Sequence, residues 1–150
     1  SVGGEQNNLQ TGDGEFNQML QLESGFGLDL TDKISFYSSA LAGVNNRTKG
    51  FSDEFRYSLE AGFGFNNKKL WLISRLIGIE SFKNGTASGE VTSTSLFANN
   101  SEHTSLLFEA AYYISKKVGV SASYGTALRG EIIAAAPAYS VGVFLDLSKK

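Results

Sequence analysis

Residues 54–65 read EFRYSLEAGFGF, and they give the clearest structural signal in the sequence. Phe55 and Phe63 stand on odd-numbered positions, Arg56 and Glu60 stand on even-numbered ones, and this alternation of apolar with polar or small residues holds along the whole stretch. Successive side chains of a β-strand point to opposite faces. A period of two therefore predicts a strand with one apolar and one polar face.

The same period recurs along most of the chain of 150 residues. It predicts strands at residues 15–30, 34–47, 54–65, 70–82, 104–114, 118–129 and 139–147. The predicted connections are alternately short and longer, and no stretch has a helical period. This order indicates an antiparallel up-and-down meander with tight turns at one end and longer loops at the other. Residues 91–97, or part of residues 1–14, could supply an eighth strand.

The length of the predicted strands favours a membrane barrel. All but the last, which has nine, run for about 11 to 16 residues, whereas soluble strands average roughly 5–6 residues and a tilted membrane strand needs about 9–11. A polar face rich in Gly, Ser, Glu and Arg suits a watery lumen. A soluble β-barrel or β-sandwich is the alternative, but it would have to bury every aromatic stripe. The expected fold class is all-β: an antiparallel up-and-down transmembrane β-barrel with about seven or eight strands in this chain, complete or part of a larger barrel.

The spacing of the aromatic residues also fits a lipid-facing band. Phe55 and Phe65 are ten residues apart, which is about 33 Å along a strand and about 25 Å in height at a tilt of about 40°. A membrane barrel carries an aromatic girdle at each edge of an apolar band of that height. The predicted girdle residues are Phe16, Phe26, Phe55, Tyr57, Phe63, Phe65, Trp71 and Tyr139.

Charged residues that share the polar parity of their strands are candidates for lining a lumen, and Arg75 is added to them because of its place in the middle of a strand. They are Glu23, Arg47, Arg56, Glu60, Arg75, Glu109 and Arg129. These side chains could set the selectivity of a pore, or they could pair with each other in a plugged lumen. The predicted strand at residues 70–82 is apolar on both sides, so its outward face stays unassigned. Because an arginine at the centre of a bilayer would cost about 2–4 kcal/mol, we expect Arg75 to point into the lumen or to be shielded by a neighbouring chain.

Composition excludes several classes of function. The chain has no cysteine, which excludes disulfides and cysteine-ligated metals. Its formal net charge is -2, so we expect no nucleic-acid partner. No apolar run reaches the roughly 20 residues of a membrane-spanning helix, and no signal peptide is visible at Ser1, as expected for a mature chain or a fragment. Residues 1–14 are expected to form an extracellular loop or an irregular N-terminal segment, and residues 15–148 the barrel strands.

Few residues suggest catalytic or metal chemistry. His103 is the only histidine, and an outer-membrane hydrolase would need a histidine beside a nucleophile or a water. The sequence places no such partner next to it, so we expect no enzyme activity and no cofactor. Asp13, Glu15, Asp53 and Glu54 could bind a hard cation or could be solvated charges. We expect no metal site.

Several stretches carry a resemblance to a known class of protein. They are residues 12–15 (GDGE), 53–57 (DEFRY), 60–63 (EAGF), 69–72 (KLWL) and 136–143 (APAYSVGV). With the alternating pattern around them, they resemble outer-membrane β-barrel proteins of Gram-negative bacteria, in particular the C-terminal part of porin-like or hydrophobic-compound-transporter-like barrels. Such barrels normally have an even number of strands. They usually end on an aromatic residue, whereas this chain ends in Leu147-Ser148-Lys149-Lys150.

The resemblance implies a location in the bacterial outer membrane, with lipid and lipopolysaccharide as surroundings. It implies a passive channel or transporter that lets small solutes through a polar lumen. The alternative is a structural or interaction barrel with a plugged lumen, whose long loops, above all residues 83–101, bind a partner. Either barrel could stand alone, form a homo-oligomer or belong to a larger membrane complex.

Overall fold

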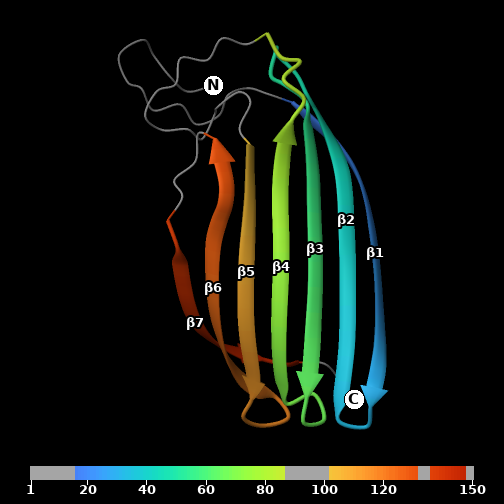
Figure 1. Ribbon diagram of the computed structural model, residues 1–150, viewed down its shortest axis with the longest axis vertical. Helices are drawn as coiled ribbons and strands as arrows, with labels where there is room; N and C mark the ends of the chain where they lie inside the picture. The colour runs from blue at the N-terminus through green and yellow to red at the C-terminus, as the bar shows by residue number, and fades with distance from the viewer. Residues whose placement is uncertain (1–15, 87–101, 132–135, 148–150) are drawn as a thin grey trace.

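A computed structural model describes residues 16–86, 102–131 and 136–147. The described residues form one antiparallel sheet of seven strands in sequence order (Figure 1). The strands are β1 (Asn17–Thr31), β2 (Ile34–Arg47), β3 (Glu54–Phe65), β4 (Leu70–Ser81), β5 (Glu102–Tyr113), β6 (Val118–Glu131) and β7 (Ala138–Leu145). This arrangement confirms the prediction of an all-β, up-and-down chain with seven strands. The first six have 12 to 15 residues, whereas β7 has eight.

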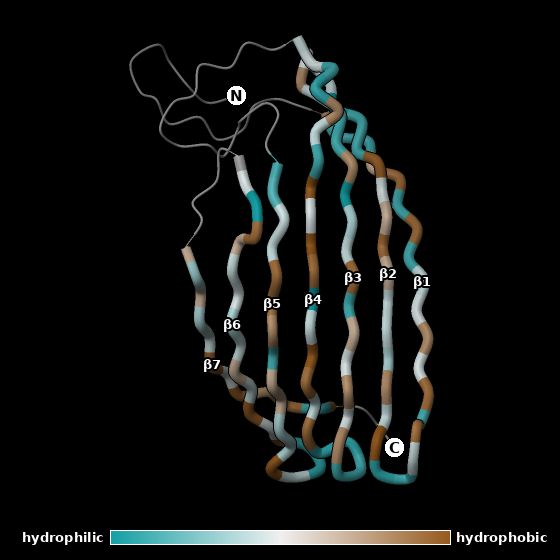
Figure 2. The backbone as a smooth tube through the Cα atoms, viewed as in Figure 1, coloured by the Kyte–Doolittle hydropathy of each residue, from teal (hydrophilic) through white to brown (hydrophobic). Residues whose placement is uncertain are grey.

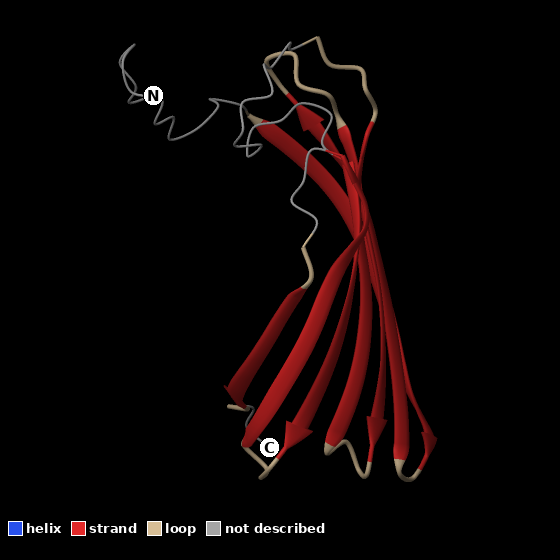
Figure 3. Ribbon diagram, turned by 60° about the vertical axis from the view of Figure 1, so that its left-hand side comes forward, coloured by secondary structure: helices blue, strands red, loops and turns tan. Residues whose placement is uncertain are grey.

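The sheet is open and twisted (Figure 3). Within the described residues β1 pairs only with β2 and β7 only with β6, so the expected closure into a barrel is not seen. The predicted irregular segment at residues 1–14 and the alternative strand at residues 91–97 lie outside the described residues. In the described part of the chain no helix is long and apolar enough to cross a membrane.

Tight turns join the strands at one end of the sheet, which we call the turn end. The hydroxyl of Thr31 accepts the backbone N–H groups of Lys33 and Ile34 at 3.2 and 3.1 Å. The turn between β3 and β4 holds Asn66 and Asn67 at φ values of 52° and 56°. Asparagine tolerates this left-handed backbone better than most residues, so the local sequence suits a tight turn here.

The opposite end of the sheet, which we call the loop end, carries an interlocked pair of connections. The backbone N–H of Phe82 donates to the carbonyl of Asp53 at 2.9 Å, and the N–H of Asp53 donates to the side chain of Asn84 at 2.9 Å. The N–H of Gly85 donates to the hydroxyl of Ser52, which is fully buried. These bonds tie residues 48–53 to residues 82–86.

Strand register sorts the side chains onto two faces. One row of paired residues runs through Gly25, Ser39, Glu60, Arg75 and Leu107, and we call its side of the sheet the polar face. A second row runs through Leu28, Phe36, Phe63, Leu72 and Ala110, and its side is the apolar face. Figure 2 shows the alternation as changes of colour along each strand. The register resolves β4, whose outward face the sequence leaves open.

The sheet has almost no buried core of its own. Among the described residues the one buried hydrophobic side chain is Ala111, at 9% exposure. Large side chains of the apolar face are open instead, including Leu22 at 78%, Phe26 at 61% and Val141 at 88%. Soluble monomeric proteins rarely expose an apolar surface of this extent.

Candidate functional site

The apolar face carries charge only near its loop end. Between the turns and the level of Tyr57, its strand positions hold aliphatic, aromatic, small or uncharged side chains. Among the side chains that the structure describes on this face, the charged ones are Glu80, Glu102 and Arg129. The rest of the face therefore presents a charge-free surface.

Arg129 departs from the predicted pattern because the register shifts between β5 and β6. Ser105 pairs with Ala127 while Thr104 pairs with Arg129, so Leu128 is one residue too many in β6. A bulge of one residue moves the following side chain to the other side of a strand. The Arg129 guanidinium accordingly lies 3.1 Å from Glu80 and 2.8 Å from Glu102 on the apolar face, away from the other charged residues with which we grouped it.

Aromatic rings gather in rows on the apolar face. On the turn-end half, ring centroids lie 5.8 Å apart for Phe26 and Phe36 and 4.9 Å apart for Phe36 and Phe63. On the loop-end half, Phe55 and Tyr57 lie 6.0 Å apart. The apolar face also holds Phe65 and Tyr139 of the predicted girdle, and Phe16 directly precedes β1. Phe36 is an addition to the predicted set.

Trp71 is the exception among the predicted girdle residues. It pairs with Gly64 and lies on the polar face, where its ring centroid is 5.5 Å from that of Tyr37. A Cβ atom at Gly64 would come within 2.8 Å of the Trp71 ring, so the absence of a side chain there lets the indole lie flat against the sheet. Its place beside a tight turn indicated a girdle residue, but its strand parity puts it opposite the apolar face.

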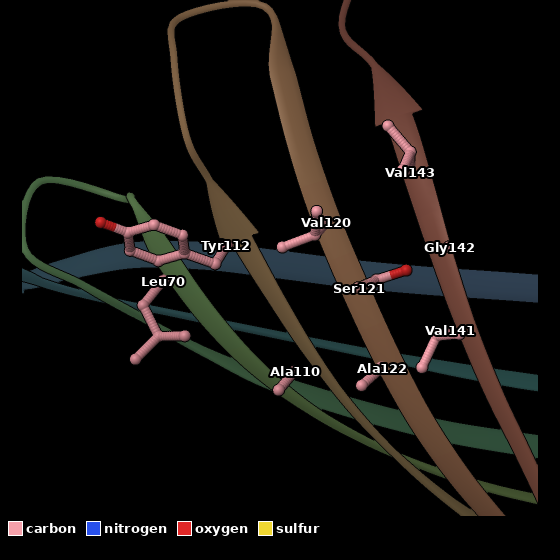
Figure 4. Close-up of a pocket in the computed structure, with 9 residues that line it drawn as sticks. All are labelled: Leu70, Ala110, Tyr112, Val120, Ser121, Ala122, Val141, Gly142 and Val143. Atoms are coloured by element: carbon pink, nitrogen blue, oxygen red, sulfur yellow. The ribbon is translucent and has the colours of Figure 1, made fainter.

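Two open depressions interrupt the apolar face where alanines stand between larger side chains. One lies around Ala110 and Ala122, with Leu70, Tyr112 and Val141 at its edges (Figure 4). The other lies around Ala40 and Ala42, beside Leu22 and Tyr57. Their linings offer few polar groups, which suits contact with hydrocarbon chains and not with a charged ligand.

The centre of the polar face is an ion pair with a tyrosine. Glu60 on β3 accepts hydrogen bonds from the guanidinium of Arg75, its partner on β4. The hydroxyl of Tyr37 on β2 donates to the same carboxylate at 2.8 Å. The ring of Tyr37 lies over Gly62, where any Cβ would collide with it. Two residues from the predicted lumen set thus come together, and Tyr37 joins them.

A second charged cluster lies at the loop end of the polar face. The Glu54 carboxylate lies 2.8 Å from the guanidinium of Arg47 and 2.9 Å from that of Arg56. The side-chain amide of Asn45 donates to Glu54 at 3.3 Å. Glu54 is buried at 6% exposure. The two arginines from the predicted lumen set therefore share one carboxylate, which the prediction did not assign to the lumen.

Asp53 in the connection between β2 and β3 is held by N–H donors. Its carboxylate accepts hydrogen bonds from the side chain of Asn84 at 2.8 Å, from the backbone of Arg47 at 3.0 Å and from the side chain of Asn46 at 3.0 Å. These bonds, that of Asn84 foremost, lower the pKa of Asp53 below its usual value.

The acidic residues considered for a cation thus have other partners where they are described. Asp53 and Glu54 both accept from nitrogen donors, while Asp13 and Glu15 lie outside the described residues. In the parts of the chain that the structure covers, no group of three metal-ligating side chains is present.

Glu23 and Glu109 also lie on the polar face, on β1 and β5. Among the described residues neither makes an ion pair, in contrast to Glu54 and Glu60. In the described ranges, no basic side chain neutralises the charge of these two carboxylates of the predicted lumen set.

His103 lies on the polar face near the loop end of β5, opposite Ile79. Its Nδ1 atom is buried and has no hydrogen-bond partner. A hydrolytic histidine needs its second ring nitrogen oriented by a carboxylate or a carbonyl. The described residues supply no such contact to Nδ1.

No family model, no curated protein and no solved structure matches this chain.

Proposed function

We propose that the chain forms part of the wall of a β-barrel in the bacterial outer membrane, and that the barrel lets small solutes pass through a polar lumen. The observation that carries this proposal is the separation of the two faces. One is exposed, apolar and charge-free over most of its height, and the other holds the Glu60–Arg75 pair and the cluster around Glu54. The apolar face would meet lipid and the polar face would line the lumen.

The height of the charge-free band supports a bilayer as its surroundings. On β4 the apolar face is uncharged from Leu70 to Gly78, and Glu80 follows at the loop end. Nine residues of strand span about 30 Å, or about 23 Å in height at a tilt of about 40°, which is close to the roughly 25 Å of the lipid-facing band of a membrane barrel. Outside a membrane this surface would be exposed to water, at a cost of about 25 cal/mol per Å².

Small residues on two strands support an open lumen. On the polar face, Ser121 pairs with Gly142, and Ser123 pairs with Ser140. The middle of β6 and β7 therefore carries small side chains on this face, with the Phe144 ring over Gly119 nearer the turn end. The polar face of β2 and β4 carries the larger side chains of Tyr37, Trp71 and Arg75. Glu23 and Glu109 add carboxylates that have no ion-pair partner in the described ranges, so this side of the sheet suits contact with water and small solutes.

The second candidate is a barrel with a filled lumen that serves as an anchor or an interaction platform. It is favoured by the pairing of Arg47, Arg56 and Arg75, each of which already has a carboxylate on the polar face. Side chains that satisfy each other across a face need no water in the lumen. The interlocked connections at the loop end would then form an ordered binding surface.

Ion conductance in planar bilayers distinguishes the two candidates. The protein should give discrete conductance steps. Because Glu109 bears an unneutralised charge on the polar face, Glu109→Gln should reduce the preference for cations in a reversal-potential measurement. The matched control is Lys33→Gln, in the exposed turn between β1 and β2, which should leave the reversal potential unchanged. Absence of conductance at every voltage, in protein shown to be inserted, would reject the channel and favour the filled barrel.

A further inference from the structure

The two outer strands of the sheet have unpaired edges among the described residues. β1 pairs with β2 from Asn17 to Thr31 and has no neighbour on its other side. β7 pairs with β6 along its whole length and likewise has one neighbour (Figure 1). In a strand with one neighbour, every second residue turns its backbone N–H and C=O outward.

Open edges are incompatible with the hydrocarbon of a bilayer. No water is present there to bond the outward N–H and C=O groups, so spanning sheets close on themselves. The apolar face of both edge strands is exposed, with Leu22 at 78% on β1 and Val141 at 88% on β7. If this face meets lipid, as proposed above, the edges of β1 and β7 lie at the same depth and need partners.

Strand direction excludes the simplest closure. β1 and β7 both run from the loop end to the turn end, because each strand of the meander reverses the one before it. Direct pairing of β1 with β7 would be parallel, unlike all six pairings in the sheet. A strand that is antiparallel to either edge must run from the turn end to the loop end.

A second copy of the chain does not solve the problem. A copy related by rotation about the membrane normal would bring its β1 against β7 of the first, which again is a parallel pair. A copy turned upside down would pair β1 with β1 and β7 with β7 in antiparallel fashion. It would, however, place its loop end on the opposite side of the membrane from the loop end of the first.

We propose that β1 and β7 are completed by strands other than the seven described ones, that each of the two adjoining strands runs from the turn end to the loop end, and that an odd number of added strands closes the barrel. The proposal rests on the membrane location proposed above. The adjoining strands have a defined chemistry. They carry apolar residues at every second position on the lipid side, and the one beside β1 is long enough to cover Asn17–Thr31.

Amide hydrogen exchange on the protein isolated in its native membrane assembly tests the proposal. If β1 has a neighbour on both sides, consecutive amides over residues 18–30 should all exchange slowly. An open edge would show loss of slow exchange at every second residue, and that result would overturn the proposal. β3, which has neighbours on both sides in the structure, supplies the internal reference for full protection.

Disulfide formation identifies the neighbour, and the absence of cysteine from the chain removes any background. Under oxidation Gln21→Cys alone should stay monomeric, and Gln21→Cys combined with Ser140→Cys should give no internal disulfide. A dimer through position 21 would reveal a second copy at the β1 edge, and an internal bond would reveal direct pairing of β1 with β7. Either result would overturn the proposal. Leu22→Cys with Ala42→Cys, a cross-strand pair of β1 and β2, is the positive control.

The result for the added strands can be distinguished from the result for the channel. Slow exchange along all of β1 without conductance would keep the added strands and reject the open lumen. Conductance together with an alternating exchange pattern would reject the added strands and keep the channel.

Discussion

Arg75 on β4 donates to the carboxylate of Glu60, its cross-strand partner on β3, at the centre of the polar face. The Glu60 side chain is 17% exposed, and the hydroxyl of Tyr37 donates to the same carboxylate. This ion pair explains how an arginine can occupy the middle of an otherwise apolar strand. The Arg75 side chain points to the polar face, where the Glu60 carboxylate neutralises its charge.

Removing Arg75 should therefore destabilise the protein. Arg75→Leu leaves the mostly buried carboxylate of Glu60 with Tyr37 as its remaining donor, and we expect a loss of about 1–2 kcal/mol in the free energy of unfolding. Urea unfolding in lipid vesicles measures it. The matched control is Lys68→Gln, which removes the exposed ion pair with Asp29 and should change little. An equal loss in both variants would contradict the role of the Glu60–Arg75 pair.

The position of the Tyr37 ring predicts the effect of adding a side chain at Gly62. A Cβ at Gly62 would collide with this ring, whereas a Cβ at Gly125 would have its nearest neighbour at 3.9 Å. Gly62→Ala should cost about 1–3 kcal/mol of stability through overpacking, and Gly125→Ala should be tolerated. In a Tyr37→Ser background most of the cost of Gly62→Ala should vanish, which a double-mutant cycle measures. The same cost in both backgrounds would show that the ring is not the cause.

The hydrogen bonds to Asp53 predict a pH dependence at the loop end. Because its pKa is lowered in the folded protein, the ionised carboxylate contributes stability above its unfolded pKa of about 3.9, and that contribution is lost as the pH falls through the lower folded value. The exchange rate of the Gly85 amide, compared between wild type and Asp53→Asn, reports it. The two proteins should differ at neutral pH and converge in acid. A difference that grows in acid would contradict the sign.

Much of the fold follows from local alternation. Residues 34–47 and 54–65 were predicted as strands, and β2 and β3 occupy those residues. The period of two is strong there because one face is consistently apolar. In β4 the leucines occupy even-numbered positions and the isoleucines odd-numbered ones, so both faces of the strand are apolar in sequence. The polar face of β4 can be identified only from its pairing with β3, which places Arg75 beside Glu60.

The parts that the sequence did not reveal depend on register. A tight turn between Phe65 and Leu70 fixes every pair of β3 and β4, so the Glu60–Arg75 pair could have been found by counting outward from that turn. The extra residue in β6 could not have been found in this way. Leu128 resembles any other apolar position of the strand, and the bulge is visible only in the pairing of β6 with β5. For that reason the polar parity of Arg129 led to the wrong face.

The most direct test of the two-faced wall uses Trp71, the one tryptophan of the chain. Its fluorescence should be little affected by brominated acyl chains in lipid vesicles, because the indole lies on the polar face beside Tyr37. Moving the reporter to the apolar face with Trp71→Phe and Phe63→Trp together should make bromine quenching strong. Equal quenching in the two proteins, or stronger quenching of Trp71, would contradict the assignment of the apolar face to lipid.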